Sequence, residues 1–325
     1  MTSNDRKCLG CKKIFTSKNQ IQNYYYGVNI GISKILKCEH CGLSQVNYIP
    51  AKKELDTFYQ QVKVEDILFG LTPEEIKKWK QPKTEDSVIK FIIKKLKIDK
   101  GQKINFLDIG AGNGIILVHA NHYTNWKTLG LEPNIQKSKI LKKLGINFLQ
   151  TSLDNYKHSG EKFDIINMSQ VLEHLTNPMD ALKKINNLLN PSGAVWIDVP
   201  NCIDLYFKSR LSDHSPHLTF WESSSLVKIF EKLDYKVISV GSFGTKIKSK
   251  IDFKDFIVRE SKYYFGWTLK KLGFLSSSVS SVSKENNYSR GRIIDKDQVG
   301  IFTQFNIQEN NFQYHKLYLL AIKRA

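Results

Sequence analysis

The chain has 325 residues, and 49 lysines and arginines against 31 aspartates and glutamates give it a formal net charge of +18. A composition of 41% hydrophobic and 25% charged residues excludes both a disordered chain and a membrane-embedded one. No apolar run approaches the roughly 18–20 residues of a membrane-spanning helix, and the polar start from Met1 to Cys8 has no signal-peptide segment. The sequence therefore predicts a cytoplasmic protein with one large domain and smaller parts around it.

The basic excess does not by itself identify a partner. Only six of the 49 basic residues are arginine, whereas surfaces that read phosphate favour arginine because its planar guanidinium binds two oxygens at once. The chain is also rich in lysine, asparagine and isoleucine, and an AT-rich genome produces this bias in any protein surface. Genome bias is the favoured explanation, and a nucleic-acid or other polyanion footprint and an acidic membrane surface stay open as alternatives.

Residues 1–49 contain four of the five cysteines, in two Cys-x-x-Cys pairs with short strands expected between them, over 22–30 and 32–36. Each pair can wrap a tight turn around one ion, and two pairs supply the four thiolates of a tetrahedral zinc site. The sequence therefore predicts a zinc ribbon with a structural Zn²⁺, whose ligands are Cys8, Cys11, Cys38 and Cys41. A redox dithiol pair and two disulfides are the alternatives, and disulfides are disfavoured without a secretory signal.

Residues 50–100 are interpreted as a helical connector. A short helix is expected over 50–59, and apolar residues recur at helical spacing over 88–96. The alternative is a lid over the site of the next domain, in which case Tyr59 or Trp79 would contact a ligand.

A glycine-rich loop is the most informative stretch of the sequence. The apolar strand expected over 104–109 ends in Gly110-Ala-Gly112-Asn-Gly114, and an apolar helix follows at once. Glycines at such a turn let a ligand approach the backbone closely and let the helix pack on the strand. The loop therefore predicts a site for a nucleotide-like ligand.

Two acidic residues narrow the class of that ligand. Asp108 lies at the strand end, two residues before the first glycine, where a carboxylate repels phosphate and suits a cationic amino group. Glu132 ends the second strand 24 residues later, where an acid can accept both hydroxyls of a ribose. A cationic amino acid joined to a nucleoside describes S-adenosylmethionine (SAM), which the sequence predicts as the cofactor.

Strands and helices alternate along the rest of the chain. Further strands are expected over 146–150, 163–168, 194–199, 237–240 and 316–322, with helices over 178–189 and 222–233. This order predicts an α/β fold: a doubly wound, mostly parallel, seven-stranded Rossmann-like sheet with helices on both faces. The core is expected over 101–244, closed by an antiparallel last strand in 313–325, with a helical and loop insertion over 245–312. An aromatic, basic stretch of that insertion, 253–274, has three further interpretations: peripheral membrane contact, a cover for the site and a dimer face.

Between about 104 and 240 the sequence resembles the class I SAM-dependent methyltransferases. The resemblance is carried by Leu-Asp-Ile-Gly-Ala-Gly-Asn-Gly from residue 107, Leu-Glu-Pro-Asn from 131, Val-Leu-Glu-His-Leu-Thr-Asn-Pro from 171 and Asn-Pro-Ser-Gly from 190. Four cysteines ahead of such a domain resemble the methyltransferases of deoxysugar and surface-polysaccharide pathways. The residues expected to bind the cofactor are Asp108, Gly110, Gly112, Gly114, Glu132, Pro133, Ser152, Leu153 and Ser169.

Three side chains are candidates for the chemistry. Glu173 and His174 follow the fourth strand, at the carboxyl edge of the sheet where ligands bind, and His174 suits a general base near neutral pH. His217, in a loop after the fifth strand, is the second candidate base. The alternatives are that Glu173 caps backbone amides, that His174 only packs and that His217 belongs to a turn before the next helix. Quinone O-methyltransferases share the Glu-His pair but place a further acid for a metal where this chain has Gln170, which disfavours metal-dependent O-methylation.

The favoured function is O- or C-methylation of a small metabolite, a sugar or nucleotide sugar of surface polysaccharide biosynthesis. RNA methylation is the first alternative, with the ribbon and the lysine-rich surface as the grip on RNA. Against it, the sequence has neither the Asn/Asp-Pro-Pro-Tyr loop used for base amino groups nor a Pro-Cys nucleophile pair. A non-catalytic module that binds SAM or a partner is the second alternative, and the oligomeric state is left open.

Overall fold

The computed structural model describes residues 7–15, 20–25, 32–47, 49–61, 88–99, 101–157, 160–202, 217–246, 307–312 and 314–324. The helices are α1 (Lys52–Gln61), α3 (Val88–Leu96), α4 (Ile115–Tyr123), α5 (Ile135–Leu144), the 3₁₀ turn η2 (Leu172–His174), α6 (Pro178–Leu188) and α8 (Ser223–Lys232). The strands are β1 (Gln20–Tyr25), β2 (Ile32–Lys37), β3 (Ser44–Val46), β4 (Asn105–Ile109), β5 (Lys127–Leu131), β6 (Phe148–Leu149), β7 (Phe163–Ser169), β8 (Leu189–Pro200), β9 (Thr219–Phe220), β10 (Tyr235–Lys246), β11 (Gln308–Glu309) and β12 (Tyr314–Lys323).

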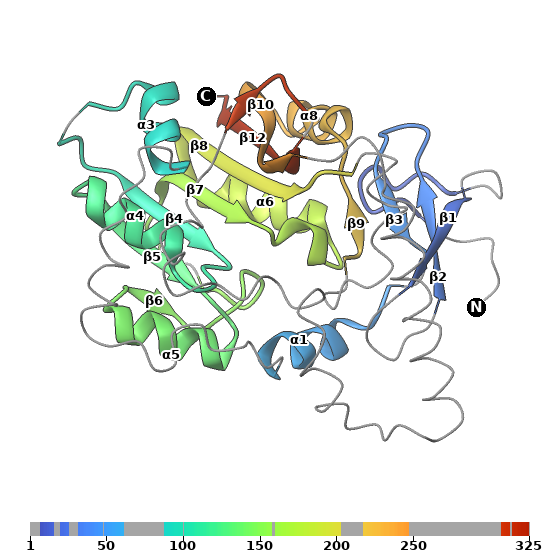
Figure 1. Cartoon of the computed structure of the whole chain (residues 1–325), viewed down its shortest axis with the longest axis horizontal. Coiled ribbons are helices and arrows are strands. Elements are labelled where there is room, and N and C mark those ends of the chain that lie inside the picture. The colour runs from blue at the N-terminus through green and yellow to red at the C-terminus, as the bar shows by residue number, and fades with distance from the viewer. Residues whose placement is uncertain are drawn as a thin grey trace.

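The larger of two sheets carries the fold, with its strands in the order β11-β10-β12-β8-β7-β4-β5-β6 (Figure 1). The neighbours from β6 to β8 pair in parallel, whereas β12 pairs antiparallel with both β8 and β10. The seven predicted strands all lie in this sheet, and β11 adds a two-residue pairing at its edge. The prediction of a doubly wound, mostly parallel α/β sheet is confirmed.

Alternate side chains of the strands face two different helical layers. In β4, Phe106 belongs to the buried cluster that includes α3, α4 and α5, and Leu107 belongs to the cluster that includes α6 and α8. The first layer is filled by large rings, among them Trp196 of β8 stacked on Tyr318 of β12 with centroids 4.7 Å apart. Because parallel strands buried on both faces must be apolar at nearly every position, they appear in the sequence as continuous apolar runs.

The cysteine-rich segment forms the second sheet, which extends onto the large domain. Its strand order is β1-β2-β3-β9, and β9 comes from the loop after β8 (Figure 1). The register pairs Ser44 with Phe220 and Gln45 with Thr219. A Cβ at Gly10 would lie 3.1 Å from Ile229 of α8, so the ribbon backbone approaches that helix closely. The ribbon therefore shares a sheet and a buried core with the domain that follows it.

Several expectations are not tested by this structure. Trp79, the segment 62–87 and the aromatic stretch 253–274 lie outside the described residues. The domain boundaries stay predictions, although the β3–β9 pairing crosses two of them. No helix in the described ranges is both long and apolar enough to cross a bilayer.

Acid should destabilise the fold through His119, a residue of α4 that is 2% exposed. Burial, followed by the nearby His122 and Lys90, lowers the pKa of His119 to about 4, so the folded state keeps it neutral. The unfolded chain binds a proton there below about pH 6.5, and the free energy of unfolding should therefore fall by about 2 kcal/mol between pH 7 and 5 through this group alone.

Urea unfolding of His119→Leu at the two pH values measures this contribution. We expect the variant to lose about 2 kcal/mol less than the native chain, and Lys139→Gln, at an exposed position of α5, to behave like the native chain. Equal losses in His119→Leu and the native chain would contradict the assignment.

Candidate active site

The glycine loop after β4 is held in place by Glu132. The Glu132 carboxylate accepts the backbone N–H of Gly112 at 2.7 Å and that of Asn134 at 2.8 Å, and the residue is 3% exposed. Gly110 has a φ of +70°, and a Cβ there would lie 2.4 Å from Val171, so no other residue fits. Glu132 therefore sits at the end of β5 with its carboxylate fixed against the loop.

A buried polar network lies beneath this loop. Asp108 is 2% exposed and accepts a hydrogen bond from the Asn167 amide at 2.6 Å. Burial raises the pKa of Asp108 to about 7, the Asn167 bond opposes that rise, and the carboxylates of Glu132 and Asp198 add to it. Ser169 donates to Asp198, which also accepts the side-chain amide of Gln170 at 2.9 Å. These groups give the floor of the site a strong negative field.

A cavity of about 920 Å³ opens above the glycine loop, within the size range of small-molecule sites. Of the predicted site residues, six line it: Gly110, Glu132, Pro133, Ser152, Leu153 and His174. The others are not among the residues that line it: Asp108, Gly112, Gly114, Ser169, Glu173 and His217. The residues expected to contact the adenosine part of SAM and the candidate base His174 therefore face one space.

Helix α1 forms one wall of this cavity. Lys52, Leu55, Asp56 and Tyr59 line it, and Lys52 reaches Asp154 with its Nζ 3.3 Å from the carboxylate oxygen. The backbone carbonyl of Tyr59 accepts the side-chain amide of Asn134 at 2.8 Å. The described part of the connector therefore lines the cavity, and its role as a lid stays a prediction.

The three candidate catalytic side chains come together at the edge of the cavity. His174 Nε2 lies 3.6 Å from Glu173 Oε1, and the rings of His174 and His217 have centroids 4.8 Å apart. Glu173 is 1% exposed, and its backbone carbonyl accepts the N–H of Leu218 at 2.7 Å. That bond fixes the residue next to His217 against η2. The donor atoms of the three side chains all lie within 4.8 Å of one another, a spacing that would also suit the ligands of one cation.

Sequence reasoning missed several residues of this site. Asn167 and Asp198 interrupt apolar strands, in Ile-Ile-Asn-Met and Trp-Ile-Asp-Val, and that interruption was a usable signal. Gln170 has a φ of +54°, a strained conformation for a residue with a side chain, and it lines the cavity. Nothing in the local sequence indicates that strain.

The four cysteines of the ribbon form one compact cluster. Cys8 and Cys41 have their Sγ atoms 3.5 Å apart, as do Cys11 and Cys38, and all four lie within 4.8 Å of one another. A tetrahedral zinc with bonds of about 2.3 Å places its sulfurs about 3.8 Å apart, so the cluster fits that ion.

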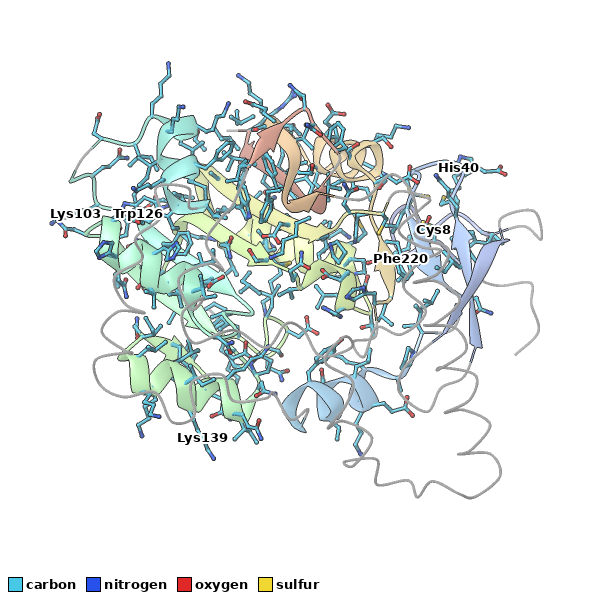
Figure 2. The ribbon with its side chains drawn as sticks, in the orientation of Figure 1. Cys8, His40, Lys103, Trp126, Lys139 and Phe220 are labelled. Atoms are coloured by element: carbon cyan, nitrogen blue, oxygen red, sulfur yellow. The ribbon has the colours of Figure 1, made fainter. Side chains whose placement is uncertain are left out.

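The two turns that carry these cysteines have the same backbone pattern. In each, a left-handed residue follows the second cysteine of the pair: Lys12 has a φ of +63° and Gly42 a φ of +76°. Their amides donate to the carbonyls of Cys8 and Cys38, at 2.9 and 2.8 Å. His40 is exposed, at the outer edge of the ribbon in Figure 2, whereas Cys8 lies in its interior. The cluster thus consists of thiols alone.

Residues 81–240 match a family model described as a methyltransferase domain. The match covers 160 of the 325 residues, just under half of the chain. The prediction of a Rossmann-like sheet is confirmed, and the match supports the predictions of a methyltransferase domain and of SAM as its cofactor.

Curated relatives match this domain over part of their length. The tRNA U34 carboxymethyltransferase of Campylobacter hominis is 32% identical over 119 residues, 34% of this chain and 41% of that protein. The ubiquinone biosynthesis O-methyltransferase of Actinobacillus pleuropneumoniae is 27% identical over 112 residues, 31% of this chain and 47% of that protein. The chain thus spans less than half the length of these two relatives, and the sugar substrate stays a prediction.

Solved methyltransferase structures are also similar to this chain. The 1,6-didemethyltoxoflavin-N1-methyltransferase of Burkholderia thailandensis aligns with a TM-score of 0.46 and 10% identity, over 94% of this chain and 100% of that one. A possible histamine N-methyltransferase of Thermotoga maritima aligns with a TM-score of 0.45 and 15% identity, over 71% of this chain and 87% of that one.

Proposed function

We propose that the protein transfers the methyl group of SAM to a small metabolite, with a sugar or nucleotide sugar of surface polysaccharide biosynthesis as the favoured acceptor. The observation that carries the proposal is the shared cavity, in which Gly110 and Glu132 face the same space as His174. A cavity of about 920 Å³ has room for a nucleoside cofactor and a small second substrate together.

The residues on one side of the cavity suit SAM. Glu132 would accept the ribose hydroxyls, since each of its oxygens keeps acceptor capacity beside the loop amide that it already binds. Ser152 and Leu153 would flank the adenine, and Asp108 would act from beneath the loop on the cationic amino group. When bound, SAM supplies an electrophilic methyl group on a sulfonium.

The residues on the other side suit proton transfer. An acceptor hydroxyl or acidic carbon must lose a proton as it is methylated, and His174 is the group placed to take it. The buried Glu173 carboxylate, 3.6 Å from Nε2, would stabilise the imidazolium that forms. His217 would pack against the His174 ring, with the two ring centroids 4.8 Å apart.

For the ribbon, we infer a structural zinc held by Cys8, Cys11, Cys38 and Cys41. The compact thiol cluster and the matching turns support this ligand set. With four protein ligands the ion would have no open position for a substrate, so its contribution would be to the fold.

RNA methylation is the second candidate function. It is supported by the net charge of +18 and by the similarity to a protein named tRNA U34 carboxymethyltransferase. A large acceptor would have to reach His174 past α1, which covers one side of the cavity.

Labelled methyl transfer distinguishes these candidates. The purified protein is incubated with ³H-methyl SAM and an extract of the source cell, and the extract is then fractionated. We expect label in the acid-soluble, small-molecule fraction. Label in precipitated material that nuclease releases would favour RNA, and SAM binding without any transfer would favour a non-catalytic module. His174→Gln, as the matched control, should bind SAM normally and transfer at least about 100-fold more slowly.

A further inference from the structure

We propose that Tyr59 is a catalytic residue that faces the acceptor and passes the acceptor's proton to His174. Tyr59 lies in the connector, outside the residues 81–240 that match the methyltransferase family model. Its hydroxyl oxygen is 2.8 Å from His174 Nδ1, and both side chains line the cavity. The inference rests on the proposed function and specifies the class of acceptor.

The neighbours of His174 assign its tautomer. Nε2 faces the buried carboxylate of Glu173 at 3.6 Å, and a bare nitrogen lone pair in that position would be repelled by the negative charge. The proton of the neutral ring is therefore placed on Nε2, and Nδ1 accepts the hydroxyl hydrogen of Tyr59. The order carboxylate, imidazole, hydroxyl is the arrangement that activates a hydroxyl for proton transfer.

The cavity sets the direction of proton flow. Tyr59 and His174 line the cavity, whereas Glu173 does not line it and is 1% exposed. An acceptor that enters the cavity meets the phenolic oxygen, which can accept a hydrogen bond while it donates its own hydrogen to Nδ1. From the acceptor inward, the groups therefore follow one another in the order Tyr59, His174 and Glu173.

The proton balance of the step is complete with these groups. The acceptor oxygen forms a bond to the methyl carbon, and the carbon–sulfur bond breaks with its electron pair left on sulfur. The acceptor proton moves to the Tyr59 oxygen as the Tyr59 proton moves to His174 Nδ1. The step leaves His174 as an imidazolium beside Glu173, and this imidazolium later returns its proton to water. Such a relay serves an acceptor that loses a proton on attack, so we assign a hydroxyl acceptor in preference to an amine.

The position of Tyr59 is fixed by contacts other than its hydroxyl. Its carbonyl accepts the Asn134 amide at 2.8 Å, and its ring meets the His174 ring edge-on with centroids 5.4 Å apart. Lys52, two turns earlier on α1, pairs with Asp154, and both residues line the cavity. The substitution Tyr59→Phe therefore removes the hydroxyl and preserves the ring and the carbonyl bond.

Two readouts test the relay. In ¹⁵N-histidine-labelled protein saturated with S-adenosylhomocysteine, the signal that disappears in His174→Gln identifies His174. We expect Tyr59→Phe to move the His174 Nδ1 resonance downfield because the nitrogen loses its hydrogen bond.

The second readout is methyl transfer from ³H-methyl SAM to the small-molecule fraction that accepts label. Tyr59→Phe should lower kcat about 100-fold and leave the KM for SAM unchanged. Tyr123→Phe, in α4 and away from the cavity lining, should change neither.

Each contrary result has a separate meaning. An unchanged Nδ1 resonance, or a kcat within about twofold of the native value, would overturn the role of Tyr59. Transfer that requires an added divalent cation and survives Tyr59→Phe would overturn it in favour of metal ligation by the Glu173, His174 and His217 group. If the native protein transfers no label, the proposed function is contradicted. If Tyr59→Phe still shifts the His174 Nδ1 resonance in that case, the hydrogen bond between Tyr59 and His174 is nevertheless present.

Discussion

Replacing Asp108 with asparagine should make the protein more stable and its binding of SAM weaker. Asp108 is 2% exposed, and burial, with the carboxylates of Glu132 and Asp198, raises its pKa to about 7. A carboxyl group whose pKa is higher in the folded than in the unfolded state destabilises the fold as the pH rises from about 4 to 7. The amide oxygen introduced by Asp108→Asn would keep the bond from Asn167 and remove that cost, so we expect a gain of about 2–4 kcal/mol in unfolding free energy at pH 8.

The effect on SAM should have the opposite sign. The cationic amino group of SAM favours the ionised form of Asp108, so native affinity should rise with pH through about 7. Asp108→Asn should bind SAM about tenfold or more weakly at pH 8 and nearly normally at pH 6. Titration calorimetry at both pH values measures this, with Glu231→Ala on the exposed face of α8 as the control. Equal SAM affinity of the variant and the native protein at pH 8 would contradict the assignment of Asp108 to the cofactor site.

Loss of one ribbon cysteine should disturb the active site as well as the ribbon. The amide of Leu9, between Cys8 and Cys11, donates to the Gln45 side chain at 2.7 Å, and the backbone of Gln45 pairs with Thr219. Thr219 lies two residues from His217. We therefore expect Cys38→Ser to lose its zinc, lower the thermal midpoint by at least about 10 °C and slow methyl transfer severely.

The matched control is Cys202→Ala, a buried thiol outside the cluster. It should retain one zinc per chain by elemental analysis and nearly full activity. Hydrogen exchange separates a local from a shared effect: Cys38→Ser should lose amide protection in residues 217–221 as well as in residues 35–46. Loss of zinc with unchanged protection in 217–221 would contradict the coupling between the ribbon and the active site.

The sequence predicts the main sheet well because its signals there are local. Buried parallel strands are continuous apolar runs, and the strands over 105–109 and 127–131 are followed directly by a glycine turn and by a helix start. The pairing of β3 with β9 has no such signal, since these strands have three and two residues and lie more than 170 residues apart. Their pairing is a tertiary contact, formed where the cysteine-rich segment packs closely against α8.

The same distinction holds within the candidate site. Glu132 and the glycine loop could be located from spacing alone, and Glu173, His174 and His217 converge as side chains at the carboxyl edge of neighbouring strands. Tyr59 could be named from the sequence only as one of two residues of a hypothetical lid. Its placement depends on where α1 packs, and that packing is fixed by contacts with Asn134 and His174, far along the chain.

A crystal structure of the protein with S-adenosylhomocysteine tests the central claim most directly. We predict the ligand in the cavity between the glycine loop and α1, with its ribose hydroxyls on Glu132 and its sulfur directed toward the side lined by Tyr59 and His174. A ligand bound elsewhere, or one whose sulfur points away from that pair, would contradict the assignment of this cavity as the site of methyl transfer.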